Sequence, residues 1–426
     1  MLASVPCYGP LDGGLKLEDG QKLVGEGADP TAVGNVNKAW ITNTTDRLDG
    51  SVLVTEGDNE VNNLLIGEED KRIKGKDIIN ANESGNLTLC NLKIVEKREE
   101  DGEGTVLNVF DNYKDGSIVL NCVESTVIRH TGIHLSTKGK AVKYLCVSYT
   151  KLLFSNLLGV NVVAKNKSEI SIRLDNVKLG SVSDGAGLLI NTENDGTVPE
   201  ILINESSIQT LFSSIIYLPK FSGKCDKSKG KLIITKSITS TVFFNPQGKA
   251  DLLLVLKDNQ ILSGAPIANL TLTPDKDINL RGSIKRNVIF GGVCLEGGKV
   301  HLKLYDNKIT SINAINIENS ETLKLTIKAQ NNTISATESS GEAIKVGKLT
   351  HKPILDFGGG KLNSKGHNSI LVNNVLITPN AVVNSNGFVA QKNWWGVGGP
   401  NIETGPGVTV DVSKPLLKPP QQFCDC

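Results

Sequence analysis

The sequence predicts an all-β right-handed parallel β-helix, a solenoid of about a dozen coils with capped ends. Composition is the first observation behind this prediction. Apolar residues make up 39% of the 426 residues while aromatic residues make up only 4%, so Val, Ile and Leu supply most of the apolar content. These side chains fit the narrow interior of stacked short strands. Chain length is the second observation, because a solenoid core grows lengthwise and escapes the size limit of a compact core.

A short repeating unit is the third observation. It consists of an alternating apolar strand, a turn that contains Asn or Asp, and one or two further apolar residues. Alternation directs every second side chain to the core, and Asn tolerates the left-handed backbone of a sharp corner. Neighbouring turns lie about 25 to 30 residues apart, so we expect the corners to stack in columns and their asparagines to bond along the axis. Clear copies lie at 87–94, 172–179, 253–261, 302–309 and 325–334, and weaker ones end at 204–208 and 235–238.

Other repeat folds fit the sequence less well. A leucine-rich repeat has a tighter period, a propeller carries an aromatic signature in each blade, and no segment has a convincing helical periodicity with caps. We expect residues 1–410 to form the β-helix, with an N-terminal opening segment and a C-terminal cap. Residues 411–426 contain Pro and Cys and are expected to leave it as an extended tail.

Charge and hydropathy bear on the partners. The net charge is +1, from 46 basic and 45 acidic residues that are spread evenly along the chain. No basic stripe is visible in the linear sequence, so we expect no nucleic-acid partner. The longest apolar stretch, 152–164, is too short to span a bilayer, which predicts no transmembrane segment. No signal sequence is visible.

Eight cysteines are dispersed and form no CxxC pair, which argues against a zinc site. Cys90, Cys122 and Cys146 stand in apolar strand-like sequence and are interpreted as buried free thiols. Disulfides in an oxidising compartment are an open alternative. Cys424 and Cys426 suggest the hypothesis that the tail is linked to another chain.

Segments near both ends resemble a known family. Residues 14–27 and 58–66 resemble the opening coils, and 355–362, 389–396 and 399–400 the closing coils, of the pectin-lyase-like right-handed β-helix proteins of bacterial surfaces. The resemblance implies the fold over nearly the whole chain. It does not select a function, because this fold hosts lyases, hydrolases, adhesins and tailspikes.

The catalytic motifs of enzymes with this fold are missing. Arg72-Ile73-Lys74 matches one galacturonan-hydrolase motif by letter, but it lies too early and its companion Asp-Asp and Gly-His-Gly motifs are absent. No arginine stands in the Arg-x-Pro-x-x-Arg context of the calcium-dependent pectate lyases. His130 and His134 are the nearest approach to a catalytic pair, since on a strand they would share a face. No carboxylate lies close by in the sequence, so we interpret both as solvent-exposed or loop histidines.

Two further features are interpreted structurally. The charge runs at 68–70 and 99–101 are expected to be solvated turns. Trp394 and Trp395 could form a platform for sugar stacking, but their place in the last coil predicts that they cover the open end of the core.

The sequence therefore predicts no catalytic residue, no metal site and no cofactor, and it leaves the binding residues unknown. We expect a secreted or cell-surface scaffold that acts in adhesion, ligand binding or assembly. Its expected partners are a carbohydrate or a protein, and self-association is a further possibility. The alternative is a carbohydrate-active enzyme, either a polysaccharide lyase or a glycoside hydrolase. That alternative requires several charged side chains to converge in one groove.

Overall fold

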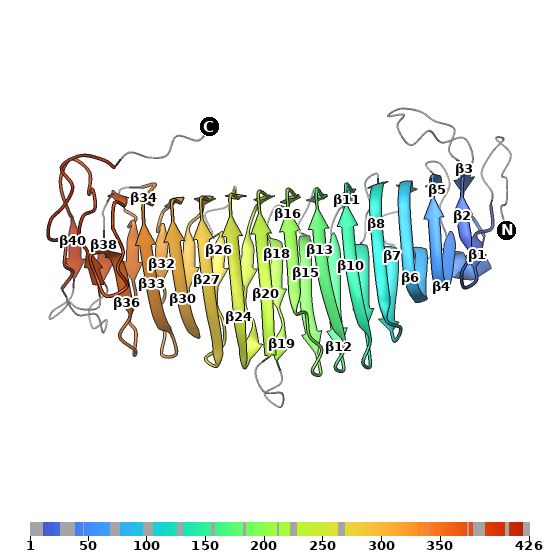
Figure 1. Cartoon of the computed structure of the whole chain (residues 1–426). Coiled ribbons are helices and arrows are strands. Elements are labelled where there is room, and N and C mark those ends of the chain that lie inside the picture. Colours follow the sequence, from blue (N-terminus) through green and yellow to red (C-terminus); the bar gives the residue numbers. More distant parts are fainter. Residues whose placement is uncertain are drawn as a thin grey trace. The chain divides into compact units, whose positions relative to one another are not determined.

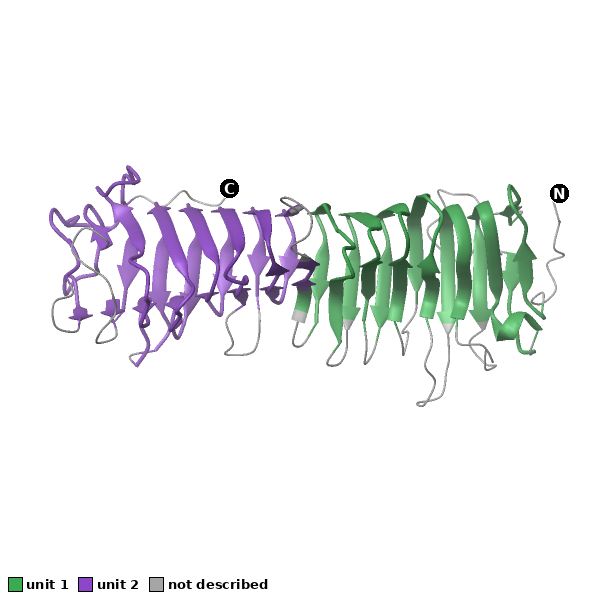
Figure 2. Cartoon of the chain, turned by 90° about the horizontal axis from the view of Figure 1, so that it is seen from below, with its two compact units in different colours: residues 1–215 green, residues 216–426 purple. Residues whose placement is uncertain are grey.

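The computed structural model describes residues 12–25, 39–45, 47–68, 77–96, 105–125, 131–154, 158–181, 185–210, 213–221, 228–262, 269–338, 340–372, 375–377, 388–404 and 409–420. The predicted fold is confirmed: the chain is an all-β parallel β-solenoid of about 11 turns. Figure 1 shows the strands of successive coils lying side by side. The chain divides into two compact units, residues 1–215 and 216–426 (Figure 2).

The first unit consists of short parallel strands and one 3-10 helix within the described residues. Its elements are β1 (Leu15–Leu17), β2 (Lys22–Val24), β3 (Ala39–Ile41), η1 (Arg47–Gly50), β4 (Leu53–Asn62), β5 (Leu64–Glu68), β6 (Asp77–Glu96), β7 (Thr105–Asn112), β8 (Gly116–Ser125), β9 (Thr131–Thr137), β10 (Val142–Ser148), β11 (Lys151–Phe154), β12 (Val160–Lys165), β13 (Glu169–Asp175), β14 (Lys178–Ser181), β15 (Ala186–Glu193), β16 (Glu200–Asn204) and β17 (Ser207–Gln209); β18 (Ser213–Leu218) spans the boundary at residue 215.

Apolar columns fill the interior of this unit. The sequence of β13, Glu-Ile-Ser-Ile-Arg-Leu-Asp, alternates buried and outward residues as the repeat predicts. Parallel register then stacks the inward residues of successive coils. Burial of one such side chain contributes about 2 kcal/mol. One column consists of Leu87, Ile118, Leu145, Ile172 and Ile201, each at most 2% exposed.

A column of glycines lies where the backbones of successive coils in this unit approach closely. A Cβ atom on Gly132 would lie 2.5 Å from the carbonyl oxygen of Gly159, and one on Gly159 would lie 2.5 Å from that of Gly187. Real Cβ contacts are not that short, so only glycine allows these backbones to meet. The Gly159 N–H donates to the carbonyl oxygen of Ala186 at 2.9 Å.

A buried lysine interrupts the apolar interior. Lys143 is inaccessible to solvent, and its ammonium donates to the carbonyl oxygens of Ser84 at 2.9 Å and Gly85 at 2.6 Å. Its neighbour in register is Gly116, which has no side chain to block that reach. Burial lowers the pKa of Lys143 to about 8, against the opposing effect of nearby acidic groups.

The second unit is built in the same way. Its strands are β19 (Lys220–Phe221), β20 (Ser228–Thr235), β21 (Ile238–Thr239), β22 (Val242–Phe244), β23 (Gln247–Gly248), β24 (Ala250–Lys257), β25 (Gln260–Ile261), β26 (Leu270–Leu272), β27 (Ile278–Lys285), β28 (Val288–Phe290), β29 (Val293–Leu295), β30 (Lys299–Tyr305), β31 (Lys308–Ser311), β32 (Ile315–Ile317), β33 (Lys324–Gln330), β34 (Thr333–Ala336), β35 (Ile344–Val346), β36 (Ile354–Gly358), β37 (Ser369–Leu371), β38 (Val375–Ile377), β39 (Phe388–Ala390) and β40 (Ile402–Thr404).

One corner of the second unit carries the predicted asparagine ladder. In every rung but the last, the side-chain amide and the backbone N–H both donate to the side-chain oxygen of the next asparagine; Asn287 does so to Asn307 at 3.0 Å in both bonds. The same amide also donates to the carbonyl oxygen of Leu256, so its polar atoms are satisfied inside the core. The rungs are Asn259, Asn287, Asn307, Asn332, Asn368 and Asn393, each at most 2% exposed.

The ladder corrects one detail of the prediction. In the first unit Asn91 and Asn176 are themselves left-handed, as predicted. At each corner of the ladder, however, the left-handed residue is the one before the ladder asparagine, with φ between 54° and 60°. Only one of these residues is itself an asparagine, so Asn is present for its amide bonds rather than for its backbone conformation. The left-handed residues are Asp258, Arg286, Asp306, Asn331, His367 and Lys392.

The cysteine prediction is also corrected. Cys90, Cys122 and Cys146 are free as expected, but Cys122 is exposed and the other two are partly buried. The reason is the alternation itself: Leu89 and Leu145 occupy the inward positions, so the adjacent cysteines face outward. Cysteines 7, 225, 424 and 426 lie outside the described residues.

The chain end stays with the last coil as far as it is described. Ala390 N–H donates to the carbonyl oxygen of Asp411 at 2.8 Å, and Leu416 N–H donates to that of Asn393 at 2.8 Å. The segment expected to leave the solenoid at residue 411 therefore follows it through Leu416. Residues 421–426 lie outside the described part of the chain.

Candidate functional site

Outward side chains of three neighbouring strands gather positive charge. The strands β27, β30 and β33 contain no aspartate or glutamate. In β30 the alternation buries Val300, Leu302 and Leu304 and exposes the residues between them, which begin with Lys299. What we call the basic face consists of the outward lysine, arginine and histidine side chains of these strands and of two residues that precede β36: Arg281, Lys285, Lys299, His301, Lys303, Lys324, Lys328, His351 and Lys352.

Parallel register aligns these side chains across coils. Lys299 is paired with Lys324, and two positions later Arg281, His301 and Thr326 share a row. A second lysine pair, Lys303 with Lys328, follows after another two positions. Adjacent strands lie about 4.8 Å apart, so each stacked pair brings two ammonium groups within easy reach of one ligand.

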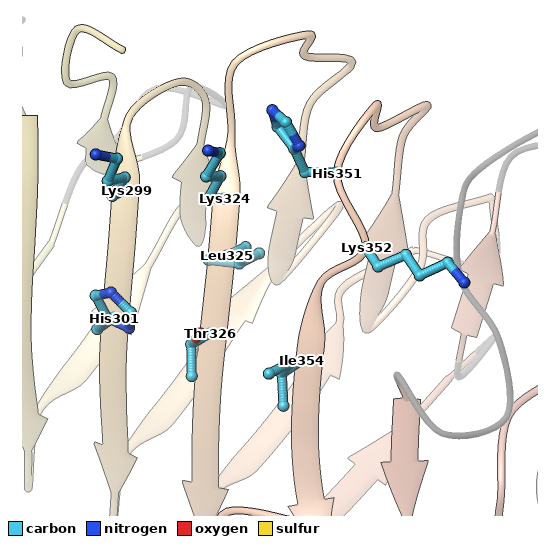
Figure 3. Close-up of a pocket in the computed structure, with 8 residues that line it drawn as sticks. All are labelled: Lys299, His301, Lys324, Leu325, Thr326, His351, Lys352 and Ile354. Carbon is cyan, nitrogen blue, oxygen red and sulfur yellow. The ribbon is translucent and has the colours of Figure 1, made fainter. Parts of the chain in front are cut away.

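A groove of about 370 Å³ lies on this face. Figure 3 shows Lys299 on β30 and Lys324 on β33 at the same level, with His301, Thr326 and Ile354 in a row below them. His351 stands on the connection that leads into β36. The lining consists of Lys299, His301, Lys324, Leu325, Thr326, His351, Lys352 and Ile354, and it includes no carboxylate.

The lysines of the groove differ from other basic side chains of this unit in that they have no acidic partner in the described part of the chain. Within the described residues, Lys299, Lys324 and Lys352 take part in no ion pair. By contrast, Arg286, at a nearby corner, forms a fork with the two oxygens of Asp258 at 2.6 and 2.8 Å, and it lowers the pKa of that carboxyl. Like charges stacked in register repel one another. The groove is therefore suited to take up anionic groups.

His134 does not occupy the environment that the sequence predicted. It lies on strand β9 and is partly buried, so the interpretation as an exposed or loop histidine is wrong for this residue. Burial lowers the pKa of its imidazole, and the charge of Lys165 adds to this effect, while Asp77 and Asp111 oppose it. Those carboxylates belong to other coils, so their proximity to His134 cannot be read from the linear sequence. His130 lies outside the described residues.

The other sequence motifs are placed as follows. Trp395 is only 3% exposed, which excludes it as a sugar-stacking surface, and Trp394 bridges Ser369 on the preceding coil. Arg72-Ile73-Lys74 and the charge run at 99–101 lie outside the described residues, as does nearly all of the run at 68–70.

The basic face was missed by sequence reasoning although its signal is present. Lys-x-His-x-Lys at 299–303 and Lys-x-Thr-x-Lys at 324–328 occupy equivalent positions of neighbouring repeats. Basic and acidic residues balance when they are counted along the chain. They do not balance when only the outward positions of these stacked repeats are counted.

Within the described residues, no three His, Cys, Asp or Glu side chains are grouped so that they could hold a metal ion. The same part of the chain contains no helix with the length and apolar character to cross a membrane. Comparison with family models, curated proteins and solved structures finds no match to this chain.

Proposed function

We propose that the protein is a secreted or surface-exposed β-solenoid scaffold of the pectin-lyase-like type, and that its basic face binds an acidic polysaccharide. The supporting observation is the stacked set of basic side chains on three strands that contain no aspartate or glutamate. The register neighbour of Lys328 on β36 is Asp356, whose carboxylate is buried and accepts bonds from backbone N–H groups instead. Such a set is unfavourable for folding, since its members repel one another. A repeating carboxylate or sulfate ligand would relieve that repulsion along several coils at once.

The groove favours a polysaccharide over a nucleic acid. Proteins that hold single-stranded nucleic acid interleave their cations with aromatic side chains on which the bases stack. The lining of the groove has imidazole, hydroxyl and aliphatic side chains but no Phe, Tyr or Trp. Duplex DNA is read by an element that enters its major groove, and flat stacked strands have no such projection.

The carbohydrate-active alternative takes a specific form. Hydrolysis of a glycosidic bond ordinarily uses two carboxyl groups, and the groove lining contains none. The side chains present, lysine and histidine, suit a lyase better, because they could neutralise a uronate and remove a proton. We rank binding above lyase activity because the groove is open and shows no buried, desolvated base of the kind that catalysis favours.

Binding to pectate, alginate and a sulfated glycan is tested by affinity electrophoresis of the full chain. We expect retardation by at least one of these polymers, weakening as salt is added because exposed charges are screened. The double variant Lys299→Gln/Lys324→Gln should weaken the retardation about tenfold, since exposed ion pairs contribute modestly. Retardation by DNA but by no acidic polysaccharide would refute the proposed ligand class.

A matched control removes the same charge elsewhere. Lys151 and Lys178 are also an exposed pair in register, on β11 and β14. The variant Lys151→Gln/Lys178→Gln should retain binding, whereas equal loss in both double variants would indicate a net-charge effect rather than a site. Ultraviolet absorbance of unsaturated products, measured in the same mixtures, decides the lyase alternative.

A further inference from the structure

The first unit carries a column of outward polar side chains on the sheet formed by β6, β7, β9 and β12. Asn80 pairs in register with Asn108, Asn108 with His134, and His134 with Asn161. The next residue in the column is Leu189, where the polar run ends. At the other side, the amide of Asn108 donates to Asp77 at 2.7 Å.

The last two polar members leave hydrogen-bonding capacity unused. The side-chain nitrogen of Asn161 lies 3.0 Å from Nδ1 of His134, which makes Nδ1 the acceptor and places the ring proton on Nε2. Both Nε2 of His134 and Oδ1 of Asn161 are buried and have no partner among the described residues. If the Asn161 amide is turned over, its oxygen accepts from a protonated Nδ1 instead. The amide nitrogen, a donor, and Nε2, an acceptor, then remain unpaired. Unpaired buried polar groups of this kind destabilise the folded chain, because they have lost their bonds to water and gained none in return.

An exposed aromatic ring lies against this pair. Phe110 stacks on the imidazole of His134 with ring centroids 5.8 Å apart, and 49% of its surface is exposed. Aromatic residues are scarce in this chain, so an exposed ring next to unpaired polar atoms is informative. A ligand that bonds to these buried atoms has to displace covering side chains, and Phe110 is an exposed side chain in contact with the imidazole.

The charges around the ring neutralise one another. Asp111 forms an ion pair with Lys165 at 3.0 Å and a longer one with Lys138 at 3.5 Å, and Lys165 also lies 4.0 Å from Glu193, so two lysines face two carboxylates. The Lys165 ammonium also lies 5.2 Å from the Phe110 ring centroid. These groups are already partnered, in contrast to the unpaired cations of the basic face.

We propose that Phe110, His134 and Asn161 form a binding site for a neutral, hydroxyl-rich sugar ring. A hydroxyl is both donor and acceptor, so one hydroxyl satisfies the two unpaired atoms together. The apolar face of the sugar ring packs on Phe110, as aromatic side chains with one wet face allow. The paired charges beside the ring give an ionic ligand no advantage. This site lies within the first unit and is separate from the basic face of the second.

Histidine signals test the proposal on the full chain. The protein has five histidines, so the imidazole spectrum of histidine-labelled protein is simple, and His→Gln variants assign each signal. The probes are three neutral hexasaccharides: cello-, manno- and xylohexaose. We expect at least one to shift the His134 signal while those of His301 and His351 stay in place. Pectate should do the reverse, so the two proposals fail or succeed separately.

Variants connect the shift to the proposed contacts. Asn161→Leu installs the residue that the next coil has in the same column, so the fold is retained while the unpaired acceptor is lost. It should weaken sugar binding about tenfold, as removal of one ligand hydrogen bond typically does, and Phe110→Ala should have a similar effect. The control Tyr144→Ser removes an exposed ring whose neighbours in register are Ser117 and Ser171, and should not alter binding. A His134 signal that none of the three sugars moves, or unchanged affinity in Asn161→Leu, overturns the proposal.

Discussion

Removal of one rung of the asparagine ladder is the sharpest test of how the second unit is held together. In Asn307→Ala, the backbone N–H of Asn287 loses its acceptor at 3.0 Å, and the carbonyl oxygen of Ile284 loses a donor at 2.8 Å. The side-chain bonds to Asn287 and Asn332 are lost as well.

The cost follows from which atoms are left without a partner. The amide of Asn287 still donates to Leu256, and the side-chain oxygen of Asn332 still accepts from the backbone N–H of residue 307, so the orphaned N–H of Asn287 dominates. An unsatisfied buried N–H, the other lost bonds and the small void together cost about 4 kcal/mol.

Solenoids often unfold in parts rather than in one step, so a local measurement is needed. Hydrogen exchange monitored by mass spectrometry should show faster exchange in peptides that cover 278–310, by about a thousandfold for the stated cost. The control is Asn279→Ala, which removes an outward asparagine whose amide donates to Asp251. If Asn307→Ala accelerates exchange no more than Asn279→Ala does, the ladder does not carry the stability assigned to it.

Three further predictions concern the first unit and the thiols. Gly159→Ala should lower the melting temperature strongly, because its Cβ would overlap a carbonyl oxygen at 2.5 Å, whereas Gly180→Ala meets only a movable side chain at 3.2 Å and should have a small effect. The folded-state pKa of Lys143 is below its ordinary value of 10.5, so the unfolded chain binds the extra proton between about pH 8 and pH 10.5. Stability of the wild type should therefore rise with pH across that window relative to Lys143→Met, and parallel melting curves of the two proteins would contradict this. Among the four cysteines that the structure describes, exposed Cys122 should react fastest with iodoacetamide and Cys294 slowest, since burial raises the pKa of Cys294 to about 11; peptide mass spectrometry gives the order.

The sequence predicted the interior of the solenoid well because alternation is a local property. The stretch from Leu87 to Ile94 shows which side chains point inward without any knowledge of the neighbouring coil. The ladder was predictable for a related reason, since its asparagines recur at the same place in each repeat. Which corner residue adopts the left-handed conformation was not predictable, because Asp258, Arg286 and Lys392 all do so.

The sites depend instead on register between coils. Lys299 and Lys324 become neighbours only because a coil of 25 residues separates them, and other coils in this unit range from 20 to 36 residues. The partners of His134 likewise come from strands that precede and follow it by whole coils. Because the coils differ in length, the residues that become neighbours cannot be identified until the strand pairing is known. The fold could therefore be predicted from the sequence, whereas the two sites could not.

The direction of the amide bonds in the ladder has a consequence for how such a chain can change its length. From Asn259 to Asn368, each rung donates its amide nitrogen to the side-chain oxygen of the rung on the next coil, so any two of these rungs are compatible ends. Duplication or loss of a complete turn would leave the series unbroken, whatever the size of the excursion between two rungs. A partial turn would leave one amide facing an apolar side chain. A single column of six side chains thus favours changes of length by complete turns, while the outer loops can vary in size.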